Sequence, residues 1–489
     1  MRIAKTIFAL LVFAAATPLS AAVETNTETQ YYALFATDKK VGHAVETRTI
    51  SAGRVTTSVK TVISMARNNV PVTIRSSETA IETTAGKPLG FKSVMELGAM
   101  AMTTEGTIND QGKIDVVISV GQNRRTQTIP WPEGALMAEG MRLLELKKGL
   151  KEGTQYTAKI FTPSLLKAWD TKVVIGPKVN CDLLGRVVRL TEGKVTTAGP
   201  TGSIESTVYV NDRMQMQKAI MLLAGMRVEM VACNRAFALS KSDVVDFLKS
   251  AGVSGPVAVG RVVAAEAITY HIEPIGKAKL SFLADGNQTV RRASDGTFLV
   301  TVRPAKAPGG AVFPYKGKAA HCLSALKPNR FVNSDDQKVI ALARNAVGDT
   351  NDAAAAVRRI EAFVYKHVEK KDLSVGFATA GEVAVSRQGD CTEHAVLATA
   401  MCRAVGIPAQ MVSGLVHVER EIYGKPHAFW PHAWTRAYVG GKWIHLDATG
   451  KRYHPGHIAF AAGSGEPAYF FNLVNTVGNF RITKLEVDQ

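Results

Sequence analysis

A single cysteine stands at a position where the sequence predicts the start of a helix. Cys391 directly follows Gly389-Asp390, Asp390 is a favourable N-cap residue, and Glu393 lies three residues later, as in a capping box. The predicted helix runs from Cys391 to about Val405. Unpaired N–H groups and the helix dipole favour an anion at such a position, so the cysteine could act as a thiolate nucleophile. A structural or disulfide role is the plainer alternative, and partner residues must decide between the two.

A thiolate nucleophile needs a base within hydrogen-bond reach, and a third group that orients the base improves it. The run PHAWTRAYVGGKWIHLDATG supplies both on a predicted β-hairpin joined by Gly440-Gly441. A two-residue turn at the glycines would place Val439 opposite Lys442. In that register His432 and Asp447 share one face as diagonal neighbours, close enough for an imidazole to reach a carboxylate.

Other histidines offer weaker alternatives for the base. His445 shares the same face but lies nearer the turn, opposite Arg436, and His394 and His427 are further candidates. The spacing of Cys391 and His394 as C-x-x-H also fits a metal site. Because no second cysteine pair with ligand spacing supports that reading, we expect neither a metal nor another cofactor.

The elements that must position these residues lie in a helix-rich C-terminal region. After Asn333, the runs SDDQKVIALARNAVGD and NDAAAAVRRIEAFVYKHVEKKD each open with capping residues. The second run places apolar side chains three and four residues apart, which predicts a helix with one buried face. These apolar residues are Val357, Ile360, Val364 and Val368.

The region upstream has the alternating, β-branched pattern of a large antiparallel sheet. From Val23 to about Ser240 we predict hairpins around 38–40 and 211–212, with one helix in the run EGMRLLELKKG. The run SKSDVVDFLKSAG predicts a short capped helix near a boundary, and the passage 304–318 reads as a linker or long loop.

The predicted fold class is therefore α+β, with a cysteine-bearing helix packed on an antiparallel sheet after a large β-rich region. The expected domains are a signal peptide (1–22), a β-rich N-terminal domain (23–250), a β-rich connecting region (251–332) and a catalytic domain (333–489).

The first residues of the sequence indicate the cellular compartment of the protein. A basic start, an apolar run from Ile7 to Ala16 and small residues near Ala22 are typical of an export signal, so we expect a periplasmic or secreted protein. No later apolar stretch is long enough to span a membrane.

The net charge of +17 favours anionic, envelope-associated partners, and no nucleic-acid module is present. The five cysteines are an odd number, and a bridge between Cys181 and Cys233 is one hypothesis.

These motifs resemble the transglutaminase-like superfamily, which shares a fold with papain-like cysteine proteases. The matching blocks are Gly389-Asp390-Cys391 with Glu393-His394-Ala395, then His432-Ala433-Trp434, then Trp443 with Asp447-Ala448-Thr449. The likeness covers roughly residues 335–485. It implies Cys391 as the nucleophile, His432 as general base and acid, and Asp447 as the group that orients the histidine. Thr435-Arg436 and Ala448 depart from the usual pattern, and this puts substrate preference in doubt.

Three functions fit these observations. The first is an exported thiol-dependent amide hydrolase that acts on a peptide or protein through a thioester acyl-enzyme, with the β-rich region positioning the substrate. The second is an acyl-transferring transglutaminase, which shares the triad and differs in what attacks the thioester. The third is a non-catalytic envelope scaffold with a vestigial triad. The bond that is cleaved and the oligomeric state stay open.

Overall fold

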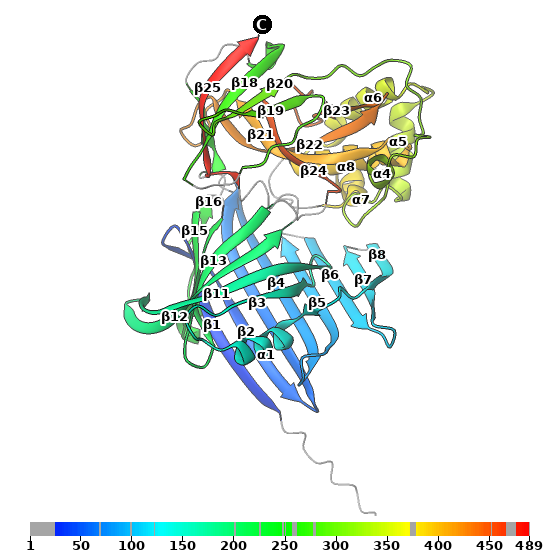
Figure 1. The fold of residues 1–489 in the computed structure, drawn as a ribbon. Coiled ribbons are helices and arrows are strands. Elements are labelled where there is room, and N and C mark those ends of the chain that lie inside the picture. The colour runs from blue at the N-terminus through cyan, green and yellow to red at the C-terminus, as the bar shows by residue number, and fades with distance from the viewer. Residues whose placement is uncertain are drawn as a thin grey trace, which may run out of the picture.

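The structure, a computed structural model, describes residues 25–488 in three sheets and a group of helices (Figure 1). Within that range it leaves out 68–69, 98–99, 122, 200–201, 224–225, 247–248, 250, 257–261, 277–279, 372–377, 451 and 466–475. The predicted signal peptide lies outside the described residues. Among the helices that are described, none has the length and apolar content needed to cross a membrane.

The N-terminal half is one 16-stranded sheet with the order β8-β7-β6-β5-β4-β3-β2-β1-β15-β14-β13-β12-β11-β10-β9, in which β16 pairs with β3. Apart from short parallel pairs at β9 and β16, neighbouring strands run antiparallel. The strands are β1 (Asn26–Ala36), β2 (Lys39–Ser51), β3 (Arg54–Arg67), β4 (Val70–Thr83), β5 (Pro88–Leu97), β6 (Met100–Ile108), β7 (Lys113–Val120), β8 (Asn123–Pro130), β9 (Ala135–Leu136), β10 (Gln155–Thr162), β11 (Lys167–Leu183), β12 (Arg186–Gly199), β13 (Gly202–Val210), β14 (Met216–Leu223), β15 (Met226–Cys233) and β16 (Val245–Asp246). The predicted hairpins at 38–40 and 211–212 are confirmed as β1–β2 and β13–β14.

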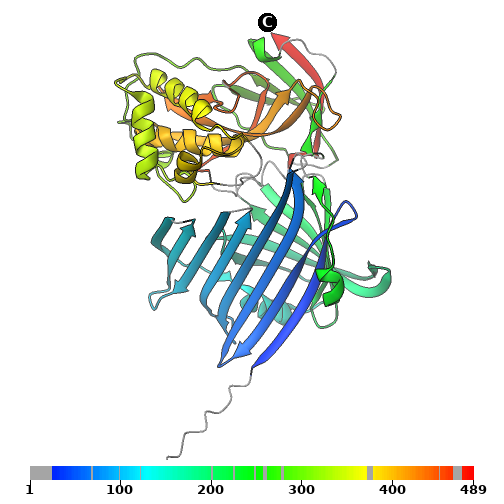
Figure 2. The same cartoon turned by 180° about the vertical axis from the view of Figure 1, so that it is seen from behind.

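The sheet is curved, with β11–β13 on the opposite side from β2–β4 in the two views (Figures 1 and 2). The predicted helix is confirmed as α1 (Ala138–Lys148). It is fixed by buried charges, because the carboxylate of Glu82 accepts the N–H groups of Glu139 and Gly140. Glu139 in turn forms a bidentate ion pair with Arg48. An anion at the start of a helix is favoured by the helix dipole, so these contacts hold α1 on the sheet.

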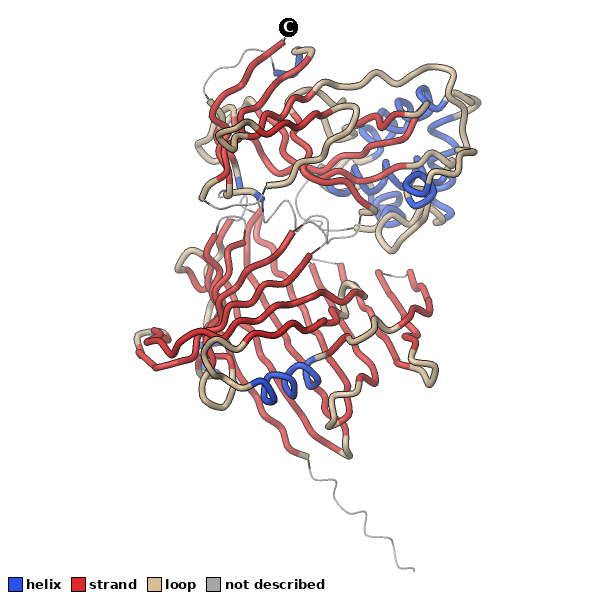
Figure 3. The backbone as a smooth tube through the Cα atoms, in the orientation of Figure 1, coloured by secondary structure: helices blue, strands red, loops and turns tan. Residues whose placement is uncertain are grey.

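The C-terminal half is layered, with helices on one face of a central sheet and a second sheet on the other (Figures 1 and 3). The central sheet has the order β17-β22-β21-β24, with β23 paired to β22, and the second sheet has the order β19-β20-β18-β25. The strands are β17 (Val253–Ser254), β18 (Ala267–Pro274), β19 (Gln288–Arg292), β20 (Phe298–Val302), β21 (Ala409–Val418), β22 (Ala428–Val439), β23 (Lys442–Leu446), β24 (His457–Gly463) and β25 (Phe480–Asp488). The connecting region therefore supplies strands to both sheets of the C-terminal half.

The helices of the C-terminal half gather on one side of the central sheet (Figure 3). They are α4 (Ala320–Ser324), α5 (Gln337–Val347), α6 (Ala353–His367), α7 (Ala380–Ser386) and α8 (Cys391–Ala404), while α2 (Arg235–Leu239) and the 3-10 turn η1 (Val262–Ala264) lie earlier in the chain. Both predicted helices after Asn333 are confirmed as α5 and α6, capped by Asp336 and Asp352. The apolar stripe predicted on α6 is fully buried.

Helix α8 begins at Cys391, as predicted, and its start is tightly specified. The side chain of Asp390 accepts the N–H of Thr392 at 2.8 Å, and Glu393 accepts the N–H of Asp390 at 3.0 Å, which completes the capping box. Gly389 has a φ of +151°, a conformation that other residues rarely adopt. The chain therefore reaches Cys391 along a path that only glycine allows.

Two predictions in the linking segments were wrong. The run SKSDVVDFLKSAG does not start a helix at Ser242 or Asp243, because Val245–Asp246 is strand β16, paired parallel with Met65 and Ala66. Tertiary pairing outweighs the capping signal here. The hypothetical bridge between Cys181 and Cys233 does not form, since both are free thiols.

Replacing Gly389 with alanine should unfold the start of α8. The new Cβ would lie 2.2 Å from the Cβ of Glu393, in addition to the strained φ. We expect a loss of at least about 2 kcal/mol in the free energy of unfolding, measured by urea denaturation. The matched control is Gly441→Ala, which has a φ of +88° and no neighbour within 4 Å of the new Cβ, so that it adds strain alone. Equal losses in both variants would contradict the packing argument.

Candidate active site

The hairpin that carries the predicted base has the expected register. Val439 pairs with Lys442 and Arg436 pairs with His445, so the turn between β22 and β23 contains only Gly440 and Gly441. Both glycines have positive φ, at +54° and +88°, as the favoured two-residue hairpin turn requires. The register continues to Thr435 opposite Leu446, one residue before Asp447.

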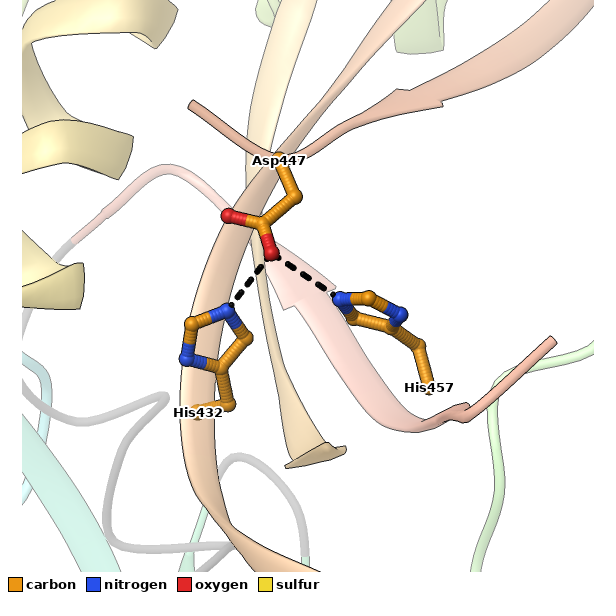
Figure 4. Close-up of side chains that lie close together, drawn as sticks. All are labelled: His432, Asp447 and His457. Atoms are coloured by element: carbon orange, nitrogen blue, oxygen red, sulfur yellow. Dashed lines mark hydrogen bonds and ion pairs between the residues drawn. The ribbon is translucent and has the colours of Figure 1, made fainter. Parts of the chain in front are cut away.

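Asp447 lies at the centre of the site, with four donors on its carboxylate, of which Figure 4 shows the two histidines. Oδ1 accepts the N–H groups of Thr449 at 2.9 Å and Gly450 at 3.3 Å. Oδ2 accepts Nε2–H of His432 at 3.0 Å and Nε2–H of His457 at 3.1 Å. An ionised carboxylate offers about four acceptor positions, so this group is fully satisfied although it is 3% exposed. Burial raises the pKa of Asp447, but the charge and hydrogen bond of His432 outweigh burial and hold it well below the usual range.

His432 connects Asp447 with Cys391. Burial acts to lower the pKa of His432, but the charge and hydrogen bond of Asp447, followed by a hydrogen bond with Cys391, raise it to about 10. The imidazole is therefore an imidazolium at neutral pH. Cys391 is half-buried at the first position of α8. The structure thus brings together Cys391, His432 and Asp447, which the sequence predicted as a set.

An indole ring covers the histidine. The ring of Trp434 stacks near that of His432, with centroids 6.0 Å apart and planes inclined by 26°, and it is 1% exposed. Its Nε1–H donates to Nδ1 of His445 at 2.9 Å, so Nε2 of His445 carries the hydrogen that is donated to Asp285 at 2.8 Å. His445 therefore anchors the tryptophan and bonds to Asp285 in place of Asp447.

The two remaining histidine candidates also lie outside the triad. His394 is buried, and its Nδ1–H donates to the carbonyl oxygen of Asp390 at 2.6 Å, while burial lowers its pKa. His427 stacks on His417, with centroids 6.0 Å apart. His394 thus braces the first turn of α8 as a neutral core residue.

Two residues that contact Asp447 were missed in the sequence. His457 opens β24, and Glu361 on α6 accepts the backbone N–H of Asp447 at 2.7 Å. Burial, and then the charge of Asp447, raise the pKa of Glu361 to about 7. Glu361 directly follows Ile360 of the buried stripe, and this position beside the stripe was the only signal for it.

Asp447, His432 and His457 also form a cluster of potential metal ligands, with their ligand atoms within 4.8 Å of one another. In the structure, Nε2 of each histidine lies at hydrogen-bond distance from Oδ2 of Asp447, so a cation at this cluster would have to displace the hydrogens on both nitrogens.

Glu361 should make stability depend on pH. Its pKa is about 7 in the folded protein against a usual value of 4.5, so the folded state binds more protons between these values. The contribution of this group is present below pH 4.5 and is lost as the pH rises through 7. We expect Glu361→Gln to flatten the fall in Tm between pH 4.5 and 8, with the exposed Glu369→Gln as control. A Glu361→Gln profile parallel to that of the parent would contradict this.

Part of the chain matches a known protein family. Residues 340–448, which include Cys391, His432 and Asp447, match the family model of the transglutaminase-like superfamily. No curated protein sequence matches the chain.

Three solved structures are similar to parts of this chain. A candidate cysteine protease from Cytophaga hutchinsonii is 22% identical over 46% of this chain and 85% of its own, with a TM-score of 0.30. A β-barrel-like protein from a domain family of unknown function in Brucella abortus is 14% identical over 43% and 96%, with a TM-score of 0.33. The periplasmic domain of TgpA from Pseudomonas aeruginosa, solved with ethylmercury, is 17% identical over 40% and 87%, with a TM-score of 0.27. On the family match and the layered fold, the C-terminal part of this chain is a transglutaminase-like domain.

Proposed function

We propose that the protein is an exported, thiol-dependent amide hydrolase that acts on a peptide or protein through a thioester intermediate. The observation that carries the proposal is the position of His432, which hydrogen-bonds to Asp447 through Nε2 and to Cys391 as well. A nucleophile, a base and an orienting carboxylate in contact are the arrangement that nucleophilic acyl transfer requires.

The reaction follows from these contacts. Sγ of Cys391, as a thiolate beside the imidazolium, attacks the carbonyl carbon of the amide and forms a C–S bond. The His432 imidazolium then gives its proton to the leaving nitrogen as the C–N bond breaks, which leaves a thioester and a free amine. Neutral His432 next takes a proton from water, the hydroxide attacks the thioester, and the acid product leaves with the thiolate restored.

When the thiolate attacks, the carbonyl oxygen of the substrate becomes an oxyanion. Groups at the start of α8 are placed to stabilise it. The backbone N–H of Cys391 is at the first helical position, where it is free of an intrahelical acceptor, and Gln388 is a second candidate donor. The net charge of +17 favours an anionic substrate from the cell envelope. Export rests on the composition of the first 22 residues.

A cavity in the N-terminal sheet favours a second candidate, a ligand-binding function of the β-rich region. The cavity has a volume of about 1490 Å³. Its wall includes apolar side chains of Met137, Met141 and Phe161 and the charged groups of Arg48 and Glu139. In the hydrolase, such a cavity would bind part of the substrate and position it for the thiol. In a scaffold protein without catalysis, the cavity would bind a ligand on its own.

Alkylation of the purified protein tests the ion pair. We expect iodoacetamide to modify Cys391 much faster than a free thiol at pH 6 to 7, because the His432 imidazolium stabilises the thiolate. His432→Ala should remove this advantage by about tenfold or more. Mass spectrometry of the alkylated peptides identifies the reactive cysteine.

Cys402 provides an internal control in the same helix. It is fully buried, and burial raises its pKa to about 12, so it should stay unmodified in the folded protein. An unreactive Cys391, or equal rates with and without His432, would reject the hydrolase and leave the scaffold.

Asp447→Asn tests the orienting role with a library of envelope peptides. The amide keeps the shape of the carboxylate but loses the charge that favours the His432 imidazolium. We expect kcat/KM to fall about 10²- to 10⁴-fold, with little change in KM. Peptide cleavage indicates hydrolysis, whereas ammonia release with incorporation of an added primary amine indicates the transferase. An unchanged kcat/KM would exclude Asp447 from the mechanism.

A further inference from the structure

His457 contacts the same carboxylate oxygen as His432 but lies outside the residues that match the family model. It opens β24, and its ring is fully buried. Nε2 lies 3.1 Å from Oδ2 of Asp447, and Nδ1 lies 2.9 Å from the carbonyl oxygen of His454. The backbone N–H of His454 also points at Nδ1, at 3.4 Å, so each ring nitrogen has a polar partner that the ring would lose on turning.

The direction of the hydrogen bond to Asp447 follows from the acceptor. An ionised carboxylate can only accept, so Nε2 of His457 carries a hydrogen whether the ring is neutral or charged. Burial lowers the pKa of His457, and the nearby His432 imidazolium lowers it further. In a neutral His457 with its hydrogen on Nε2, Nδ1 accepts the backbone N–H of His454 at 3.4 Å. The ring then adds an N–H donor to Oδ2 without adding a second positive charge.

We propose that His457 is a positioning residue whose Nε2–H shares Oδ2 of Asp447 with His432 and so limits how strongly the carboxylate holds the His432 proton. The inference rests on the proposed function, since it concerns the same thiolate–imidazolium pair. A carboxylate that loses one of two donors on an oxygen becomes a stronger acceptor for the other. Without His457, the His432 proton should therefore be harder to remove.

The charge balance around His457 is simple. The titratable groups that surround it come from β22, β23, the segment after β23 and the segment before β24; they are His432, His445, Asp447, Tyr453 and His454. Burial lowers the pKa of His445 and lowers that of His454 to about 3, and it raises that of Tyr453. These three are uncharged at neutral pH.

The remaining charges near His457 are those of Asp447 and His432, with Asp285 one layer further out. Cys391 contacts His432, and Glu361 contacts the backbone of Asp447; the pKa of Glu361 is about 7, so this group has already lost its proton in the alkaline range of the test. Asp285 is already paired with Arg436, whose Nη1 lies 3.0 Å from Oδ2 of that carboxylate. Removing a donor from Asp447 should thus change mainly how firmly His432 holds its proton.

The test is the alkaline limit of Cys391 alkylation by iodoacetate. This reagent is an anion, so the imidazolium attracts it, and the rate falls when His432 loses its proton. In His457→Leu, which has no donor, we expect the midpoint of that fall to move up by about 0.5 to 1 pH unit. In His457→Gln, whose amide nitrogen can take the place of Nε2, we expect the midpoint of the parent protein.

Two controls separate positioning from packing. His417→Leu removes a histidine from the adjacent strand β21 without touching Asp447 and should leave the midpoint unchanged. If His457→Leu fails to fold, His457→Asn replaces it, because the shorter amide cannot reach Oδ2 and should show the same upward shift. Tm values report the cost in stability separately.

The outcomes are distinct. An upward shift in His457→Leu or His457→Asn but not in His457→Gln supports the inference. The same midpoint in all these variants, beside a parent profile that still depends on His432, overturns the role of His457 alone. A parent profile that is indifferent to His432→Ala overturns the proposed function and this inference with it.

Discussion

The buried negative charge of Asp447 is the constraint around which the C-terminal half is arranged. A carboxylate with 3% exposure is costly unless it is hydrogen-bonded on all sides, and here the donors come from separate parts of the chain. One is on β22, one opens β24, and two are backbone groups just beyond the aspartate. Each strand of the central sheet that reaches this point must be in register, since a shift of one residue would replace a donor with an apolar side chain.

The electrostatics of the site follow from this arrangement. The charge and hydrogen bond of Asp447 raise the pKa of His432, and the same ring contacts Cys391 at the start of the neighbouring helix. The helix contributes by its position, because Gly389 and the capping box bring Cys391 to the first turn. Trp434, anchored through His445 to Asp285, packs beside the ring of His432. The connecting region therefore takes part in the site through a residue that touches none of the reacting groups.

Local signals were enough to predict the start of α8 and the register of the β22–β23 hairpin but not their surroundings. A capping box and a two-glycine turn fix geometry within about twenty residues, so the place of Cys391 on its helix and the shared face of His432 and Asp447 could be inferred from spacing. His457 and Glu361 reach Asp447 through the packing of β24 and α6, which no local pattern records. The same limit explains the error at Val245–Asp246, where a strand forms because β3 is there to pair with it. The large antiparallel sheet was predictable from alternation, whereas its strand order was not.

The pairing of β18 with β25 has a consequence for how the molecule is made. Ala267 lies opposite Asp488, so the second sheet joins segments that leave the ribosome far apart in time. Contacts of such long sequence separation form slowly, because a long loop must close before they gain any energy. Until β25 arrives, β18 has an unpaired edge and the face of the central sheet that carries Trp434 lacks part of its cover. The cover over the Trp434 face of the central sheet should thus be completed only after residues 480–488 have been made, since Phe480 and Ile482 pack in the same cluster as Trp434.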